Sequence, residues 1–277
     1  MRGSCYDKKD ISDEGLKQFR RRLRLIGVTV SILLLWNGVC DFIYAYSPNL
    51  SGFQYFSPLV WKTINTAGNR PHWVIMIAQT AGWLYPIYAL SYYHWWVGMR
   101  RAGFWLSALP CGMLTYAIVM IGGIQHAGWA FLSVLAQAKA ITGCTDSAFY
   151  EMTNRFIIEH FVIGDLTAIL AFNIGTIWHA VAIGSGRTMY PRWYVLVSPL
   201  GVLTITMVLG ALLPAPYAGF LIALFGTWFM LIPCIASTIW LWNIDIGCSD
   251  TNQCVANEIR MRHRTKDKQR LRKKHSD

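Results

Sequence analysis

The sequence predicts an all-α protein: a polytopic membrane helical bundle with six transmembrane helices and both termini in the cytoplasm. Composition is the first observation, because 54% of the 277 residues are hydrophobic and only 14% are charged, whereas soluble domains carry about a quarter charged residues. Apolar stretches of about 20 residues, enough to cross ~30 Å of hydrocarbon, also recur along the chain. A large soluble core would contain one or two such stretches, not six.

The six expected spans are separated by short connections and one longer segment. They are Leu25–Tyr46, Trp73–Val97, Phe104–His126, Ile157–Ile183, Tyr194–Leu213 and Tyr217–Trp242. Together they form one transmembrane domain at 25–243, flanked by basic cytoplasmic tails at 1–24 and 244–277.

The longer segment, at 128–155, is expected to be helical and to lie on the outer side. Trp129 to Ile141 is predicted to form a helix that ends at Gly143, and Asp146 is suited to cap a second helix. Such a segment can serve as a lid, as a helix at the membrane interface or as a plain connection.

Charge predicts the orientation. Most of the net charge of +11 lies in the two tails. With both tails inside, the loops carrying Arg100 with Arg101 and Arg187 with Arg192 also fall inside, so 21 Lys and Arg residues are cytoplasmic and four are not. This asymmetry is typical of membrane proteins, whose cytoplasmic loops are rich in Lys and Arg.

Membrane lipids are the expected partners, with anionic headgroups at the basic tails. No nucleic acid is expected, because the tails lack interleaved aromatic residues and the sequence shows no folded nucleic-acid-binding domain. The sequence leaves the oligomeric state open.

Two of the 14 acidic residues, Asp41 and Asp165, lie well inside apolar runs. A carboxylate at bilayer depth is costly and persists where it faces a protein interior or a wet cavity. A rise of 1.5 Å per residue places both in the outer half of the bilayer, level with Gln79, His126 and His160. These five positions from four spans predict one outward-facing polar pocket.

The expected catalytic residues are the ionisable members of this layer: Asp41, Asp165, His126 and His160. The expected substrate-binding residues are aromatic or amide side chains in or near it: Trp36, Asn37, Gln79, Tyr85 and Gln125. Asn37 and Asp41 share one face of the first span, and Tyr85, Tyr88 and Tyr92 form a stripe on the second. A structural alternative is that Asp41 only bonds Asn37 or a hydroxyl of a neighbouring helix.

Several short segments carry a family resemblance. They are Trp36–Asp41, Ala81–Tyr88, Gln125–Gly128, Thr153–Phe156, Arg187–Trp193 and Leu212–Pro216. In order and spacing the chain from Leu25 to Trp242 resembles a family of multi-spanning membrane proteins known only as a domain of unknown function. The resemblance implies a helical membrane bundle and no particular activity.

Three functions remain open. The favoured hypothesis is an intramembrane enzyme that uses Asp and His acid–base chemistry on a lipid or isoprenoid, with Trp and Tyr faces stabilising a cationic intermediate. The alternatives are a small transporter or proton-coupled carrier, and a receptor or scaffold whose polar layer only holds helices together. A metal-hydrolase version of the enzyme would use His126, His160 and an aspartate, and it ranks lower because no His-x-x-x-His pair supports it. No cofactor is expected.

Overall fold

The structure, a computed structural model, describes residues 13–46, 71–143, 146–156, 158–159 and 166–242. Its contacts divide the chain into two units, one of residues 1–22 with 242–277 and one of residues 23–241. The second unit contains the helical body described below.

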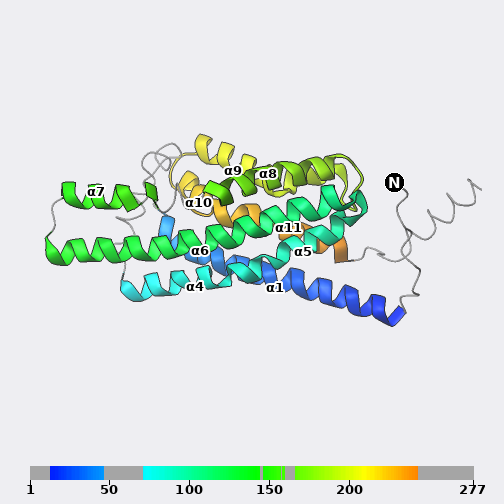
Figure 1. The fold of residues 1–277 in the computed structure, drawn as a ribbon, viewed down its shortest axis with the longest axis horizontal. Helices are drawn as coiled ribbons and strands as arrows, with labels where there is room; N and C mark the ends of the chain where they lie inside the picture. The colour runs from blue at the N-terminus through cyan, green and yellow to red at the C-terminus, as the bar shows by residue number, and fades with distance from the viewer. Residues whose placement is uncertain (1–12, 47–70, 144–145, 157, 160–165, 243–277) are drawn as a thin grey trace, which may run out of the picture. The chain divides into compact units, whose positions relative to one another are not determined.

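Every described secondary-structure element is a helix, which confirms the all-α prediction (Figure 1). The elements are α1 (Asp13–Ala45), α4 (His72–Tyr88), α5 (Leu90–Met99), η1 (Arg100–Ala102), α6 (Phe104–Thr142), α7 (Asp146–Phe156), α8 (Leu166–Gly184), η3 (Arg192–Val197), α9 (Pro199–Leu212), α10 (Tyr217–Ala223) and α11 (Phe225–Trp242).

Four helical stretches in the described part are long and apolar enough to cross a membrane. They are Glu14–Ile43, Trp73–Ala102, Phe104–Gly122 and Leu166–Gly184. The last two predicted spans correspond to shorter apolar helices. The 14 residues of α9 reach only about 21 Å, and α11 is separated from α10 by a break at Leu224. Six spans and the cytoplasmic termini therefore stay predictions.

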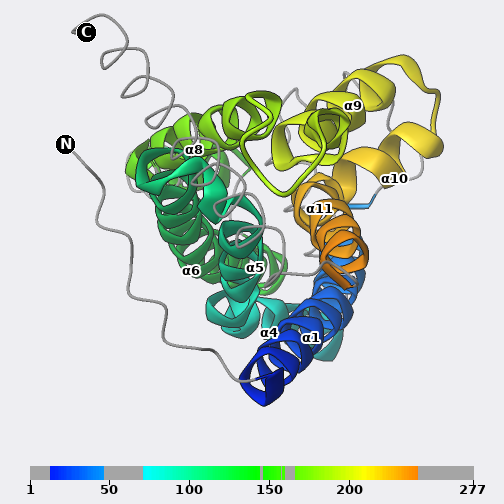
Figure 2. The ribbon, with the colours of Figure 1, turned by 90° about the vertical axis from the view of Figure 1, so that its right-hand side faces the viewer.

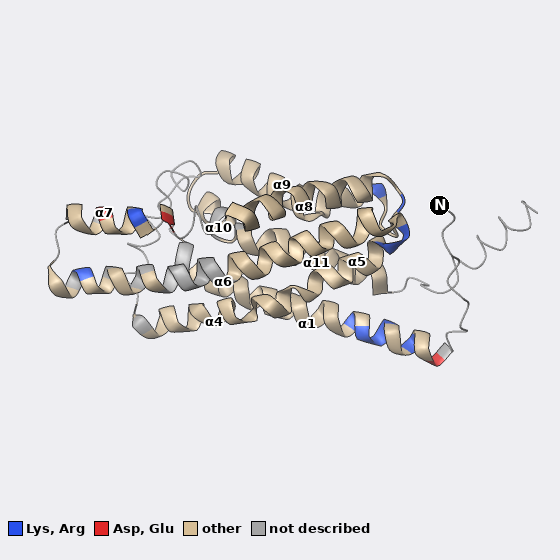
Figure 3. Cartoon of the chain, in the orientation of Figure 1, with Lys and Arg blue, Asp and Glu red and all other residues tan. Residues whose placement is uncertain are grey.

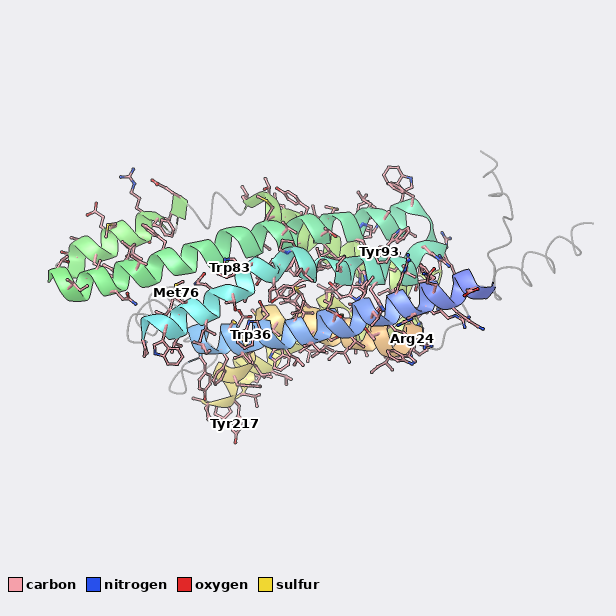
Figure 4. The ribbon with its side chains drawn as sticks, turned by 90° about the horizontal axis from the view of Figure 1, so that it is seen from below. Arg24, Trp36, Met76, Trp83, Tyr93 and Tyr217 are labelled. Carbon is pink, nitrogen blue, oxygen red and sulfur yellow. The ribbon has the colours of Figure 1, made fainter. Side chains whose placement is uncertain are left out.

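The outer surface of residues 23–241 differs from that of a soluble protein. Large apolar side chains face outward, with Ile32 60% and Trp83 73% exposed, while polar Asn37 and His179 are only 2% and 0% exposed. Trp83 lies on the outer face of α4, close to Met76 (Figure 4). Such an apolar surface is stable against hydrocarbon and not against water, which agrees with a membrane protein.

Helix α11 runs antiparallel to α1 and lies against it over much of its length. Gly27 of α1 faces Thr238, and Gly38 faces Thr227. Between these levels the Ser31 hydroxyl lies 3.6 Å from Cys234 Sγ. Small residues let the two backbones approach closely, as membrane helices commonly do.

On the other side of the unit, α6 packs against α4, α5 and α8 (Figure 2). Gly122 of α6 lies against the Tyr85 ring of α4, and Gly175 of α8 lies against Leu114 of α6. Helix α11 also contacts this group of helices, because Phe229 of α11 packs on Phe172 of α8 with ring centroids 4.9 Å apart.

The segment at 128–155 is organised differently from the prediction. The expected separate helix from Trp129 is wrong, because α6 runs unbroken for 39 residues, about 58 Å, to Thr142. Its expected end is confirmed: Gly143 caps it in the left-handed conformation with φ 65°, which glycine adopts without strain. The expected second helix is also confirmed as α7, starting at Asp146.

Helix α7 folds back along the far half of α6. Phe156 lies 4.6 Å from Phe131 between ring centroids, and Lys139 Nζ lies 5.0 Å from the centroid of Phe149. In the last turn of α7, Arg155 Nε donates at 2.8 Å to Oε1 of Glu159, which lies just beyond the helix. That hydrogen bond raises the pKa of the Arg155 guanidinium.

The two arginine-bearing loops lie at one end of the unit (Figure 3). The backbone N–H of Met189 donates to Gly98 O at 2.8 Å, which joins the loop after α8 to the end of α5. Arg100 and Arg101 follow directly in η1, and Arg187 and Arg192 flank Met189. The fold therefore agrees with a common side for both loops, and their cytoplasmic location stays a prediction.

Gly122→Ala is expected to destabilise the protein by about 1–3 kcal/mol, because a Cβ atom at that position would overlap the Tyr85 ring. Gly112→Ala on the same helix is the matched control, since nothing lies within 4 Å of its Cβ position. Thermal unfolding of the purified variants measures both. Equal unfolding temperatures for the two variants would contradict the described contact between α4 and α6.

Candidate functional site

The Asp41 carboxylate is the centre of a three-residue hydrogen-bonded cluster between α1 and α11, here called the Asp41 cluster. Asn37 Nδ2 donates to Asp41 Oδ2 and to Thr227 Oγ1, both at 2.8 Å, and Thr227 Oγ1 donates to Asp41 Oδ2 at 2.8 Å. Asn37 and Asp41 meet because residues four apart share one helix face. Thr227 reaches them from the other helix.

Two glycines allow this close approach. The Gly38 backbone leaves room for the Thr227 side chain, whose Cγ2 atom lies 3.2 Å from an ideal Cβ position there. Gly226 faces Asp41 with 3.8 Å between its Cβ position and Oδ2. The cluster therefore sits where α1 and α11 nearly touch, so hydrogen bonds can form between short side chains.

An apolar groove of about 290 Å³ opens beside the Asp41 cluster. Its lining comes from α1, α10, α11 and the junction before α11: Leu35, Gly38, Val39, Phe42, Phe220, Leu224, Thr227, Trp228 and Leu231. The only hydroxyl in that lining belongs to Thr227, which also bonds Asp41. The groove and the carboxylate thus share one residue.

The register of the helices gives approximate levels for Gln79 and His126, whose place in one polar layer with Asp41 stays a prediction. Trp36 Nε1 donates to Thr80 Oγ1 at 2.8 Å, which sets Gln79 level with the Asp41 cluster to within about a turn. Gly122 meets Tyr85, so the backbone of His126, one turn further along α6, lies near the level of residue 81. A shared level is not a contact, and no bond between these residues and Asp41 is described.

Of the remaining predicted site residues, the side chains of Trp36 and Tyr85 are described and those of the other four are not. Trp36 is 38% exposed and bridges α1 to α4 through Thr80, whereas Tyr85 is 8% exposed and packs on α6. Neither lines the groove. Asp165 and His160 lie outside the described residues, as do the side chains of Gln125 and His126. Their predicted roles stay predictions.

Thr227 is the residue of the Asp41 cluster that the sequence did not single out. A threonine in an apolar helix carries little signal, because its hydroxyl can bond the carbonyl one turn earlier, as Thr204 and Thr238 do here. The adjacent Gly226 was the one available hint, since glycine marks a close helix contact.

A second polar cluster, also missed, lies further along α11. Ser237 Oγ lies 2.7 Å from His94 Nδ1 of α5 and 2.6 Å from the Tyr190 hydroxyl in the loop after α8. All three are buried, and burial raises the pKa of the Tyr190 hydroxyl, so it stays neutral. This cluster ties the loop to two helices and, unlike the Asp41 cluster, lies beside no described groove.

The described residues contain no group of three or more His, Cys, Asp or Glu side chains that could hold a metal ion. Neither polar cluster therefore resembles a metal site within that part of the chain. The chemistry available at the Asp41 cluster is proton transfer and hydrogen bonding by one carboxyl, one amide and one hydroxyl.

No family model, no curated protein and no solved structure matches this chain. The resemblance to a family of multi-spanning membrane proteins stays a prediction.

Thr227→Val is expected to lower the free energy of unfolding by about 1–3 kcal/mol, because Asp41 loses a buried donor. Thr204→Val is the matched control: its hydroxyl bonds only its own helix, at Leu200 O, and faces outward. Chemical or thermal unfolding in detergent compares them. An unfolding free energy for Thr227→Val equal to that of Thr204→Val would show that the bond between α1 and α11 contributes nothing.

Ser237→Ala is expected to release the loop that follows α8, since that serine bonds both His94 and Tyr190. The predicted readout is several-fold faster trypsin cleavage after the exposed Arg187. Ser107→Ala serves as control, because the buried Ser107 hydroxyl bonds only Gly103 O within its own turn. Unchanged cleavage in Ser237→Ala would mean that other contacts hold the loop.

Proposed function

We propose that this integral membrane protein takes the apolar chain of a lipid or isoprenoid into the groove between α1, α10 and α11. Asp41 then performs acid–base chemistry on the bound molecule. One observation carries the proposal: the only hydroxyl in the groove lining belongs to Thr227, and Thr227 donates a hydrogen bond to the Asp41 carboxylate.

The groove suits a single hydrocarbon chain. Its volume of about 290 Å³ is at the lower end of small-molecule sites, so it takes part of a lipid rather than a whole one. Leu35, Phe42, Phe220 and Leu231 supply aliphatic and aromatic contacts. Because Leu35 and Phe220 are 55% and 44% exposed on the outside of the unit, a chain can enter sideways from the bilayer.

The Thr227 hydroxyl then determines which end of the ligand lies beside it. A hydroxyl, carbonyl or ester oxygen that reaches this point in hydrocarbon needs a hydrogen-bond partner. The carboxyl group of Asp41 can donate or accept a proton there, while Asn37 and Thr227 act as positioning residues. In this proposal Asp165, His126 and His160 supply further proton-transferring groups, and Gln125 and Gln79 supply substrate contacts.

The proposed setting is a cellular membrane with both tails in the cytoplasm. Support comes from the arginines that the fold gathers at one end and from the position of the basic tails in the sequence. Anionic headgroups are the proposed partners of these basic groups.

A non-catalytic scaffold is the second candidate, and a specific observation favours it. The Asp41 carboxylate on α1 accepts hydrogen bonds from Asn37 and from Thr227. Because Thr227 lies on α11, the carboxylate also links α1 to α11. A scaffold needs the cluster for folding alone, whereas an enzyme also needs Asp41 to react.

Val39→Trp is expected to reduce binding of a photoactivatable long-chain fatty acid or prenol severalfold, because the larger side chain fills the groove that Val39 lines. Ile32→Trp is the matched control, on the exposed face of the same helix but not in the groove lining. Crosslinking yield in purified protein measures both variants. Equal labelling of the two would refute the proposed chain site.

Asp41→Asn is expected to fold and bind the photoactivatable chain normally, because an amide oxygen still accepts from Thr227. It is expected to abolish any change that the wild type makes in a total lipid extract, followed by mass spectrometry of proteoliposomes. The scaffold candidate predicts no lipid conversion even by the wild type, with loss of folded protein in the Asp41→Leu variant.

A further inference from the structure

A row of deeply buried side chains along α4 and α5 carries polar atoms without a protein partner. Tyr88, Tyr92 and Trp95 are 0%, 1% and 1% exposed, and His179 of α8 is 0% exposed. Within the described part of the chain, the two hydroxyls, the indole N–H and both nitrogens of His179 have no hydrogen-bond partner. We call these four residues the unpaired row.

The members of the unpaired row are neighbours in space. The ring centroids of Tyr92 and Trp95 are 4.9 Å apart, and those of Trp95 and His179 are 5.3 Å apart. Tyr88 lies one turn before Tyr92 on the stripe that the sequence predicts for the second span. Side chains with unpaired polar atoms from two segments of the chain, Tyr92 and Trp95 of α5 and His179 of α8, therefore pack on one another.

Deep burial alone does not explain the lack of partners. Tyr194 is equally buried at 1% exposure, yet its hydroxyl donates to Pro233 O at 2.7 Å. His94 is also 1% exposed and is paired with Ser237. Buried polar groups in proteins are almost always paired, so the five unpaired atoms on these four side chains point to a bound ligand.

The chemistry of these atoms selects a small ligand that both donates and accepts. An indole N–H only donates, a neutral imidazole offers one donor and one acceptor, and a phenol does both. Water matches this mixture and is held in proteins where two to four polar groups converge. A charged ligand is disfavoured, because no Asp, Glu, Lys or Arg belongs to the row.

We propose that Tyr88, Tyr92, Trp95 and His179 form an internal site for ordered water in the middle of the helical unit. The inference does not depend on lipid binding: a hydrated interior and an empty groove are compatible, as are a dry interior and an occupied groove.

The first test uses the sign of a stability change. Tyr92→Phe and Tyr88→Phe are expected to lower the unfolding temperature by about 2–4 °C each, because each removes a hydroxyl bonded to water. Tyr194→Phe, which loses the bond to Pro233 O, gives the reference decrease. If the row is dry, deleting an unpaired hydroxyl raises or does not change the unfolding temperature, and that outcome overturns the proposal.

The second test detects the water itself. X-ray radiolysis of the purified protein in H₂¹⁸O oxidises side chains beside bound water, so Trp95 and Tyr92 are expected to take up ¹⁸O much faster than the equally buried Tyr194. His179→Phe is expected to slow uptake at Trp95, since it removes a neighbouring polar group. Uptake at Trp95 and Tyr92 as slow as at Tyr194 would refute the site even if the unfolding temperatures fell.

Discussion

The polar contacts of α11 hold together helices that hydrophobic burial alone would not join. In hydrocarbon, one apolar helix surface gains nothing by exchanging lipid for another helix, so close packing and hydrogen bonds must supply the specificity. Helix α11 meets α1 at Thr227, α5 at Ser237 and α8 at Phe229. These partners come from three separate parts of the chain, and α11 joins them.

The two polar clusters on α11 differ in what they leave accessible. Thr227 and Ser237 are ten residues apart in the sequence, about 15 Å along the helix. The Ser237 hydroxyl is hydrogen-bonded to the buried side chains of His94 and Tyr190, so its partners are both protein groups. Thr227 bonds Asp41 and also faces an apolar groove. One helix thus carries a closed cluster and an open one, and only the open one can receive a ligand.

The sequence predicted the features that composition and helix periodicity control. Long apolar runs gave the all-helical fold, and the four-residue spacing of Asn37 and Asp41 gave their hydrogen bond. It did not predict Thr227 or Ser237, because a hydroxyl in a helix can bond its own backbone and so does not indicate a partner. The unbroken course of α6 was missed because the third span was expected to end at His126, where the apolar run is long enough to cross the bilayer, while contacts with α7 accompany the continuation.

The unbroken course of α6 also has a mechanical consequence. Its first half packs among α4, α5 and α8, and its second half, beyond the apolar stretch that ends at Gly122, is covered by α7. Because α6 is one continuous helix of about 58 Å, a displacement of its α7 end is carried along the helix toward Gly122, which lies against the Tyr85 ring. Binding events at that end would thus reach the interior of the bilayer as a tilt.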